Sequence, residues 1–115
     1  MDVMRVRAIH TFPEKRGPAV EHASVRVDEA GLAGDRPKKA AVSLVGADSP
    51  QTRANLVLDG PTADVESLDG LVLRIGGVLL AAGATGNHCA GLYAAVGQAG
   101  TVRVGDPVEV VEEQA

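Results

Sequence analysis

Short apolar segments, each stopped by a glycine, proline or aspartate turn, most limit what this 115-residue chain can fold into. The pattern favours a closed or nearly closed β-barrel of about eight short strands, an all-β fold with one or two short helical segments. Thr62 is the predicted N-cap of one helical turn ending near Leu68, and a second segment rich in helix formers follows Cys89. Gly76-Gly77 is a two-residue hairpin signal. The predicted strands are 4–10, 20–27, 41–45, 54–58, 71–75, 78–82, 102–104 and 108–111.

Composition predicts one domain spanning 1–115, with a barrel core of about 4–111. The core must be aliphatic, because Phe12 and Tyr93 are the only aromatic residues. A formal charge of −4 gives no general attraction to nucleic acid or to an anionic membrane. No apolar run is long enough to cross a membrane, and the first residues do not resemble an export signal. Together with a single cysteine, these features predict a cytoplasmic protein.

That cysteine, Cys89, stands in the run Gly86-Asn87-His88-Cys89-Ala90-Gly91. A lone cysteine can form neither an internal disulfide nor a four-ligand zinc site by itself. Two interpretations stay open: burial as a small hydrophobe, and a chemical role as a reactive thiol. The adjacent His88 could tune that thiol or be uninvolved.

Arg53 and Asn55 form a second candidate site. If residues 54–58 form a strand, residues two apart point to one face, so the guanidinium and the carboxamide would project together. Arginine suits phosphate, and asparagine suits the edge of a heterocycle. The alternative is a solvated strand face.

The double-glycine loop supplies a third candidate, Asp35-Arg36, with Lys38 adding positive charge nearby. A ligand contact and an ion pair closing the loop are both open. His10 and His22 have no partner at metal-ligand spacing and are expected to be structural or surface residues. Gly83-Ala84-Thr85-Gly86 resembles a dinucleotide loop, but Cys89 occupies the place of its third glycine and too few residues follow.

Several motifs occur in a fixed order along the chain: Gly31-Leu32-Ala33-Gly34-Asp35-Arg36, Val42-Ser43-Leu44-Val45, Thr52-Arg53-Ala54-Asn55-Leu56-Val57, Gly60, Leu68-Asp69-Gly70, Leu73-Arg74-Ile75-Gly76, Cys89 and Val102-Arg103-Val104-Gly105-Asp106-Pro107-Val108. This ordered set resembles the MOSC domain, the family named for the C-terminal domain of molybdenum cofactor sulfurases. The resemblance runs from about Val6 to Val111. It implies a β-barrel, in agreement with the strand pattern.

The resemblance also implies site residues. Cys89 would be the reactive centre, either as a persulfide carrier or as a ligand to molybdenum. The arginine and asparagine of the T-R-x-N motif would contact the pterin of the molybdenum cofactor, and the G-D-R loop would lie near the same site. The implied cofactor-binding residues are Asp35, Arg36, Arg53 and Asn55. Lys38 and His88 join this candidate set because of their charge and their position beside these motifs.

Three functions follow as hypotheses. The first is a sulfur-carrier or sulfurtransferase domain that binds molybdenum cofactor (molybdopterin). The second is a molybdenum-dependent reductase of N-hydroxylated compounds, and the third is a non-catalytic interaction module. The implied partners are a cysteine desulfurase, which alone would bring pyridoxal phosphate, or a molybdoenzyme. The segments after Arg36 and after Cys89 are short for the family, so a second subunit in a homodimer could cover the site.

Overall fold

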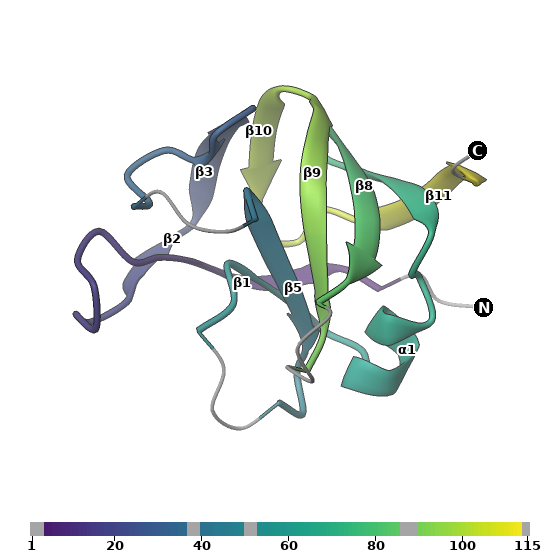
Figure 1. The fold of residues 1–115 in the computed structure, drawn as a ribbon, viewed down its shortest axis with the longest axis horizontal. Helices are drawn as coiled ribbons and strands as arrows, with labels where there is room; N and C mark the ends of the chain where they lie inside the picture. The colour runs from purple at the N-terminus through teal and green to yellow at the C-terminus, as the bar shows by residue number, and fades with distance from the viewer. Residues whose placement is uncertain (1–3, 37–39, 50–52, 86–89, 114–115) are drawn as a thin grey trace.

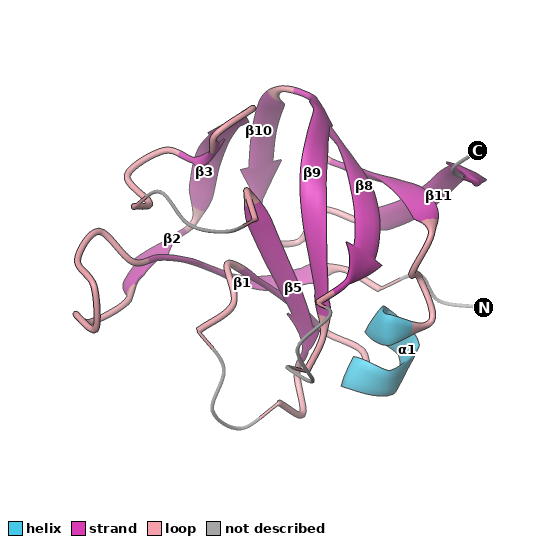
Figure 2. Ribbon diagram, in the orientation of Figure 1, coloured by secondary structure: helices cyan, strands magenta, loops and turns pink. Residues whose placement is uncertain are grey.

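The computed structural model describes residues 4–36, 40–49, 53–85 and 90–113 (Figure 1). Strands dominate this part of the chain, and its single helix is α1 (Thr62–Glu66), so the all-β prediction is confirmed (Figure 2). The strands are β1 (Val6–Thr11), β2 (Val20–His22), β3 (Ser24–Asp28), β4 (Gly31–Leu32), β5 (Val42–Gly46), β6 (Leu56–Leu58), β7 (Leu71–Ile75), β8 (Val78–Ala84), β9 (Leu92–Gln98), β10 (Gly100–Arg103) and β11 (Val108–Glu113).

Eight of these strands form one curled sheet in the order β11-β7-β8-β9-β5-β6-β1-β2 (Figure 1). All neighbours in it are antiparallel except β5 and β6, which run parallel. The sheet turns back on itself as a half-barrel: Arg5 bridges to Pro107, and the Val108 amide donates to the Met4 carbonyl at 2.8 Å. These bonds join the residues before β1 to the start of β11, the edge strand at the far end of the strand order.

The second sheet, β10-β3-β4, packs against the eight-stranded sheet, because its Val25, Val27, Leu32 and Val102 belong to the same buried core. The Gly77 amide donates to the Thr101 carbonyl at 3.1 Å, which attaches β10 to the β7–β8 turn. The core between the sheets is aliphatic, as composition predicts. Its largest fully buried side chains include Ile9, Leu44, Leu56, Leu58, Leu73, Ile75, Leu80 and Leu92.

The hairpin prediction at Gly76-Gly77 is confirmed, since Ile75 pairs directly with Val78. Gly76 has φ 59°, the left-handed backbone that such a turn needs at its first position. The helix-former prediction after Cys89 is wrong, because residues 92–98 form strand β9. Alanine favours a helix in isolation, but β9 hydrogen-bonds to β8 on one side and β5 on the other, and that pairing outweighs local propensity.

The start of α1 also differs from its prediction. Pro61 occupies the N-cap position, and Thr62 is the first helical residue. The Asp48 carboxylate serves this helix end instead: its Oδ1 accepts from the Thr62 amide at 2.8 Å and from the Thr62 hydroxyl at 2.7 Å. These bonds favour the ionised form, so the pKa of Asp48 is lowered. No helix in the described ranges is long and apolar enough to span a membrane.

Candidate functional site

Asn55, the residue directly before β6, is the centre of a buried hydrogen-bond network. Its side chain is fully buried. Nδ2 donates to the His10 carbonyl and to Asp35 Oδ2, both at 3.1 Å. Oδ1 accepts from the Ser43 amide at 3.1 Å and from the Ser43 hydroxyl at 3.3 Å. These partners fix the orientation of the amide and use both of its hydrogens and both oxygen lone pairs.

Asp35 connects this network to the double-glycine loop. While Oδ2 accepts from Asn55, Oδ1 accepts from the Phe12 amide at 2.8 Å. The loop reaches this position because Gly31 has φ 118°, and a Cβ atom there would overlap the Ala41 carbonyl oxygen. A residue with a side chain could not adopt this path, which explains the first glycine of the motif.

Phe12, the residue directly after β1, connects Arg53 to Asp35 and Arg36. The Arg53 guanidinium carbon lies 4.2 Å from the centroid of the Phe12 ring, a cation–π geometry. Its Nη1 donates to the Gly17 carbonyl at 2.9 Å. The Phe12 carbonyl accepts from the Arg36 amide at 3.3 Å. Phe12 therefore contacts Asp35, Arg36 and Arg53 at once.

Four predicted site residues are thus brought together, although they come from two motifs well separated in the sequence: Asp35, Arg36, Arg53 and Asn55. One geometric expectation for them is wrong. Strand β6 begins only at Leu56, so Arg53 and Asn55 do not share a strand face. Arg53 is exposed and Asn55 is buried. Their roles in binding a cofactor stay predictions.

Cys89, His88 and Lys38 lie outside the described residues. The described chain resumes just after the cysteine, and there the Gly91 amide donates to Glu66 Oε2 at 2.9 Å. The Glu66 carboxylate, at the end of α1, therefore fixes the backbone directly before β9.

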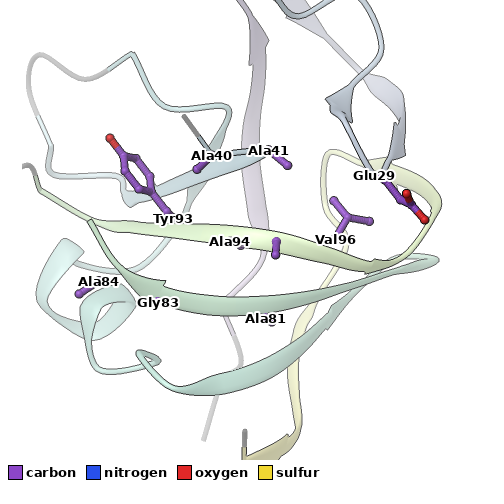
Figure 3. Close-up of a pocket in the computed structure, with 10 residues that line it drawn as sticks. Glu29, Ala40, Ala41, Ala81, Gly83, Ala84, Tyr93, Ala94 and Val96 are labelled. Carbon is purple, nitrogen blue, oxygen red and sulfur yellow. The ribbon is translucent and has the colours of Figure 1, made fainter. Parts of the chain in front are cut away.

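Two shallow grooves, each of about 470 Å³, run beside this network and share Glu29 and Ala41 in their linings. In the first, Tyr93 and Glu29 stand at opposite ends of a floor of alanine and glycine (Figure 3). Tyr93 pairs across the strands with Ser43, whose hydroxyl bonds to Asn55. Asp35 lines the second groove. The grooves therefore border the polar network rather than lying apart from it.

The two predicted structural histidines fit that role. His22 Nε2 lies 2.8 Å from the buried Thr11 hydroxyl and ties β2 to β1. The His10 ring packs against Phe12 at a centroid distance of 6.5 Å. Within the described ranges, no group of three histidine, cysteine or acidic residues is placed to hold a metal ion.

Sequence reasoning did not include Phe12 or Ser43 in the site. Phe12 carries one signal, since it is the only phenylalanine in the chain and stands between a strand and Pro13. Ser43 lies within a matching motif, but nothing in its spacing distinguishes it from the apolar residues beside it.

No protein-family model matches this sequence, and no curated protein is significantly similar to it. Solved structures share its fold. YuaD from Bacillus subtilis has a TM-score of 0.75 at 18% identity, covering 98% of both chains. YiiM from Escherichia coli has a TM-score of 0.65 at 19% identity, covering 96% of this chain and 71% of YiiM. A third structure, of a hypothetical protein, has a TM-score of 0.71 at 17% identity, covering 94% of this chain and 68% of the other.

At such identities the likeness shows the fold alone. That fold supports the MOSC-like architecture expected from the order of the motifs.

Proposed function

We propose that this chain is a MOSC-like domain that binds molybdenum cofactor or carries sulfur to it, with Cys89 as the reactive thiol. One observation carries the proposal. The Asp35-Arg36 loop and the Arg53–Asn55 segment, implied by the resemblance to serve one ligand, meet around Phe12 and are joined by the bond between Asn55 and Asp35.

The donor chemistry fits a cofactor that carries a phosphate. The Arg53 guanidinium is exposed, and among the described residues only its Nη1 has a hydrogen-bond acceptor. Its other N–H groups suit phosphate oxygens, which Arg36 would help to neutralise. The Asn55 side-chain amide is bonded to Ser43, His10 and Asp35, so we assign it the role of positioning Asp35 and His10 rather than a direct contact with the cofactor. When bound, the cofactor would supply a redox-active metal; Cys89 would supply a soft thiolate.

In the carrier role, the Cys89 thiolate would attack the sulfane sulfur of a donor persulfide. The new sulfur–sulfur bond would form on Cys89, and the donor thiolate would leave, so no external oxidant is needed. A cysteine desulfurase is the class of donor that fits this step, and a molybdoenzyme or its cofactor is the class of acceptor.

The test is the molybdenum and pterin content of the whole chain, purified from a host that makes the cofactor. Cys89→Ser and Arg53→Ala are compared with Arg74→Ala, which removes another exposed arginine on β7, outside the proposed site. We expect cofactor in the wild type and in Arg74→Ala, and its loss in the other two variants.

Intact mass on the same samples tests the sulfur-carrier role, through one added sulfur that depends on Cys89. Electron-supplied turnover of an amidoxime by loaded protein would instead favour the reductase. If the wild type carries neither cofactor nor added sulfur, the proposal is wrong and the interaction-module hypothesis takes its place.

A further inference from the structure

Phe12 is exceptional in this chain because it is a buried aromatic ring beneath a charged, exposed side chain. Only 7% of Phe12 is accessible to solvent, while Arg53 above it is exposed. The guanidinium carbon lies 4.2 Å from the ring centroid. The positive charge of the guanidinium therefore lies over the face of the ring, a favourable cation–π arrangement.

A second contact fixes the guanidinium laterally. Nη1 of Arg53 donates to the Gly17 carbonyl at 2.9 Å. That carbonyl is itself held by a tight turn, in which the Gly17 amide donates to the Glu14 carbonyl at 3.0 Å. The turn directly follows Phe12, so one short segment supplies both contacts to Arg53.

The backbone of Phe12 is bound to the other predicted ligand loop. Its amide donates to Asp35 Oδ1 at 2.8 Å, and its carbonyl accepts from the Arg36 amide at 3.3 Å. The Phe12 ring contacts Arg53, and the Phe12 backbone is hydrogen-bonded to Asp35 and Arg36. Phe12 therefore links the Arg53 guanidinium to the Asp35-Arg36 loop.

We propose that Phe12 is a positioning residue for anion recognition: it holds the Arg53 guanidinium in place before the ligand arrives, and thereby sets the affinity of the site for phosphate groups. The inference rests on the proposed function in taking the Arg53 side chain as a ligand contact. Its physical basis is preorganisation. A long side chain that is already ordered loses less conformational freedom on binding than one that is free in solvent.

The experiment uses the whole chain without cofactor, and inorganic phosphate as the probe. Phosphate affinity is measured by titration for the wild type, Phe12→Leu, Phe12→Tyr, Arg53→Lys and the double variant Phe12→Leu/Arg53→Lys. Arg74→Lys is the matched control, on a strand outside the site. In parallel, ¹⁵N relaxation of the Arg53 Nε–H group reports how ordered the guanidinium is in the free protein.

We expect Phe12→Leu to weaken phosphate binding about two- to tenfold, the range that follows from freeing one long side chain. The same variant should lower the Arg53 Nε order parameter, whereas Phe12→Tyr, which keeps an aromatic ring, should leave the order parameter and the phosphate affinity at their wild-type values. In the Arg53→Lys background, Phe12→Leu should have little further effect, because the planar group that stacks on the ring is already gone. Arg74→Lys should match the wild type.

The inference is overturned if folded Phe12→Leu keeps the wild-type Arg53 order and phosphate affinity, or if the wild type binds no phosphate. It is also overturned if Phe12→Leu weakens binding equally in both backgrounds, which would indicate a general structural effect. Failure of the proposed function looks different: phosphate affinity would depend on Phe12 as expected while the chain carries neither molybdenum cofactor nor sulfur on Cys89.

Discussion

Replacing Asn55 by aspartate changes the buried network by one donor and one charge, and the structure predicts a large, pH-dependent loss of stability. The side chain is fully buried, and its Nδ2 lies 3.1 Å from Asp35 Oδ2. In Asn55→Asp a carboxylate oxygen would take the place of that donor. Two unit charges about 3 Å apart repel by about 5 kcal/mol at an effective dielectric constant of about 20. Asp35 is partly exposed, so we expect a loss of about 3–5 kcal/mol in the free energy of unfolding at pH 7.

The loss of stability in Asn55→Asp should be small in acid and larger at neutral pH. Burial and the Asp35 charge raise the pKa of the introduced carboxyl above its unfolded value of about 3.9. Below about pH 4 this carboxyl is protonated in both states and can donate again, so the deficit relative to wild type is small there. The deficit grows as the pH rises above the unfolded pKa of about 3.9, and it is constant once the pH exceeds the raised pKa of the folded state. Urea unfolding followed by circular dichroism at several pH values measures it.

A second substitution separates the charge from the other contacts. In Asp35→Asn the repulsion is absent and a donor faces the introduced carboxylate, so Asn55→Asp should cost about 2–4 kcal/mol less in that background. The His10 carbonyl still lacks its donor in the double variant, so recovery should be incomplete. An equal cost in both backgrounds, or a cost independent of pH, would refute this account of the network.

Two further predictions concern backbone and helix-end contacts. Gly31→Ala should lower the free energy of unfolding by about 2–4 kcal/mol, because its φ is unfavourable for alanine and the new Cβ would overlap the Ala41 carbonyl. Gly34 has φ 87° but open surroundings, so Gly34→Ala should cost only about 1 kcal/mol. Equal costs of the two substitutions in thermal unfolding would contradict the predicted overlap. Asp48→Asn should lower the melting temperature at neutral pH, because it weakens acceptance from Thr62 at the start of α1. Since the folded pKa of Asp48 is lowered, its contribution is fully present above about pH 4 and is lost as the pH falls through the folded pKa. The difference between Asp48→Asn and wild type should therefore shrink in acid, and a constant difference would show that Asp48 acts in another way.

The all-β class and the β7–β8 hairpin could be predicted because their signals are local. Alternating apolar residues and Gly76-Gly77 encode a strand, a turn and a strand within one short segment. Strand β9 could not be predicted in this way, because its residues form a strand only through pairing with β8 and β5. The parallel pairing of β5 with β6 likewise depends on the path of the chain between them rather than on their composition.

Four of the candidate residues are neighbours in the structure, but their geometry could not be predicted from the sequence. Motif order pointed to Asp35, Arg36, Arg53 and Asn55, and the predicted strand placed Arg53 and Asn55 on one face. The two side chains diverge because β6 starts after them. Phe12 was missed for a related reason: its role comes from contacts with loops about 20 and 40 residues away, which no local pattern records.

The pairing of residues 4–6 with 105–108 has a consequence during synthesis on the ribosome. The Val108 amide bonds to the Met4 carbonyl, and the Val6 amide bonds to the Asp106 carbonyl at 2.9 Å, so residues 4–6 find these partners only after residue 108 has emerged. Until then β7 lacks β11, and the growing sheet has an uncovered edge of apolar strands. In a nascent chain stalled before residue 105, β7 would therefore lack its β11 partner, and unpaired strand edges of this kind favour pairing with other chains.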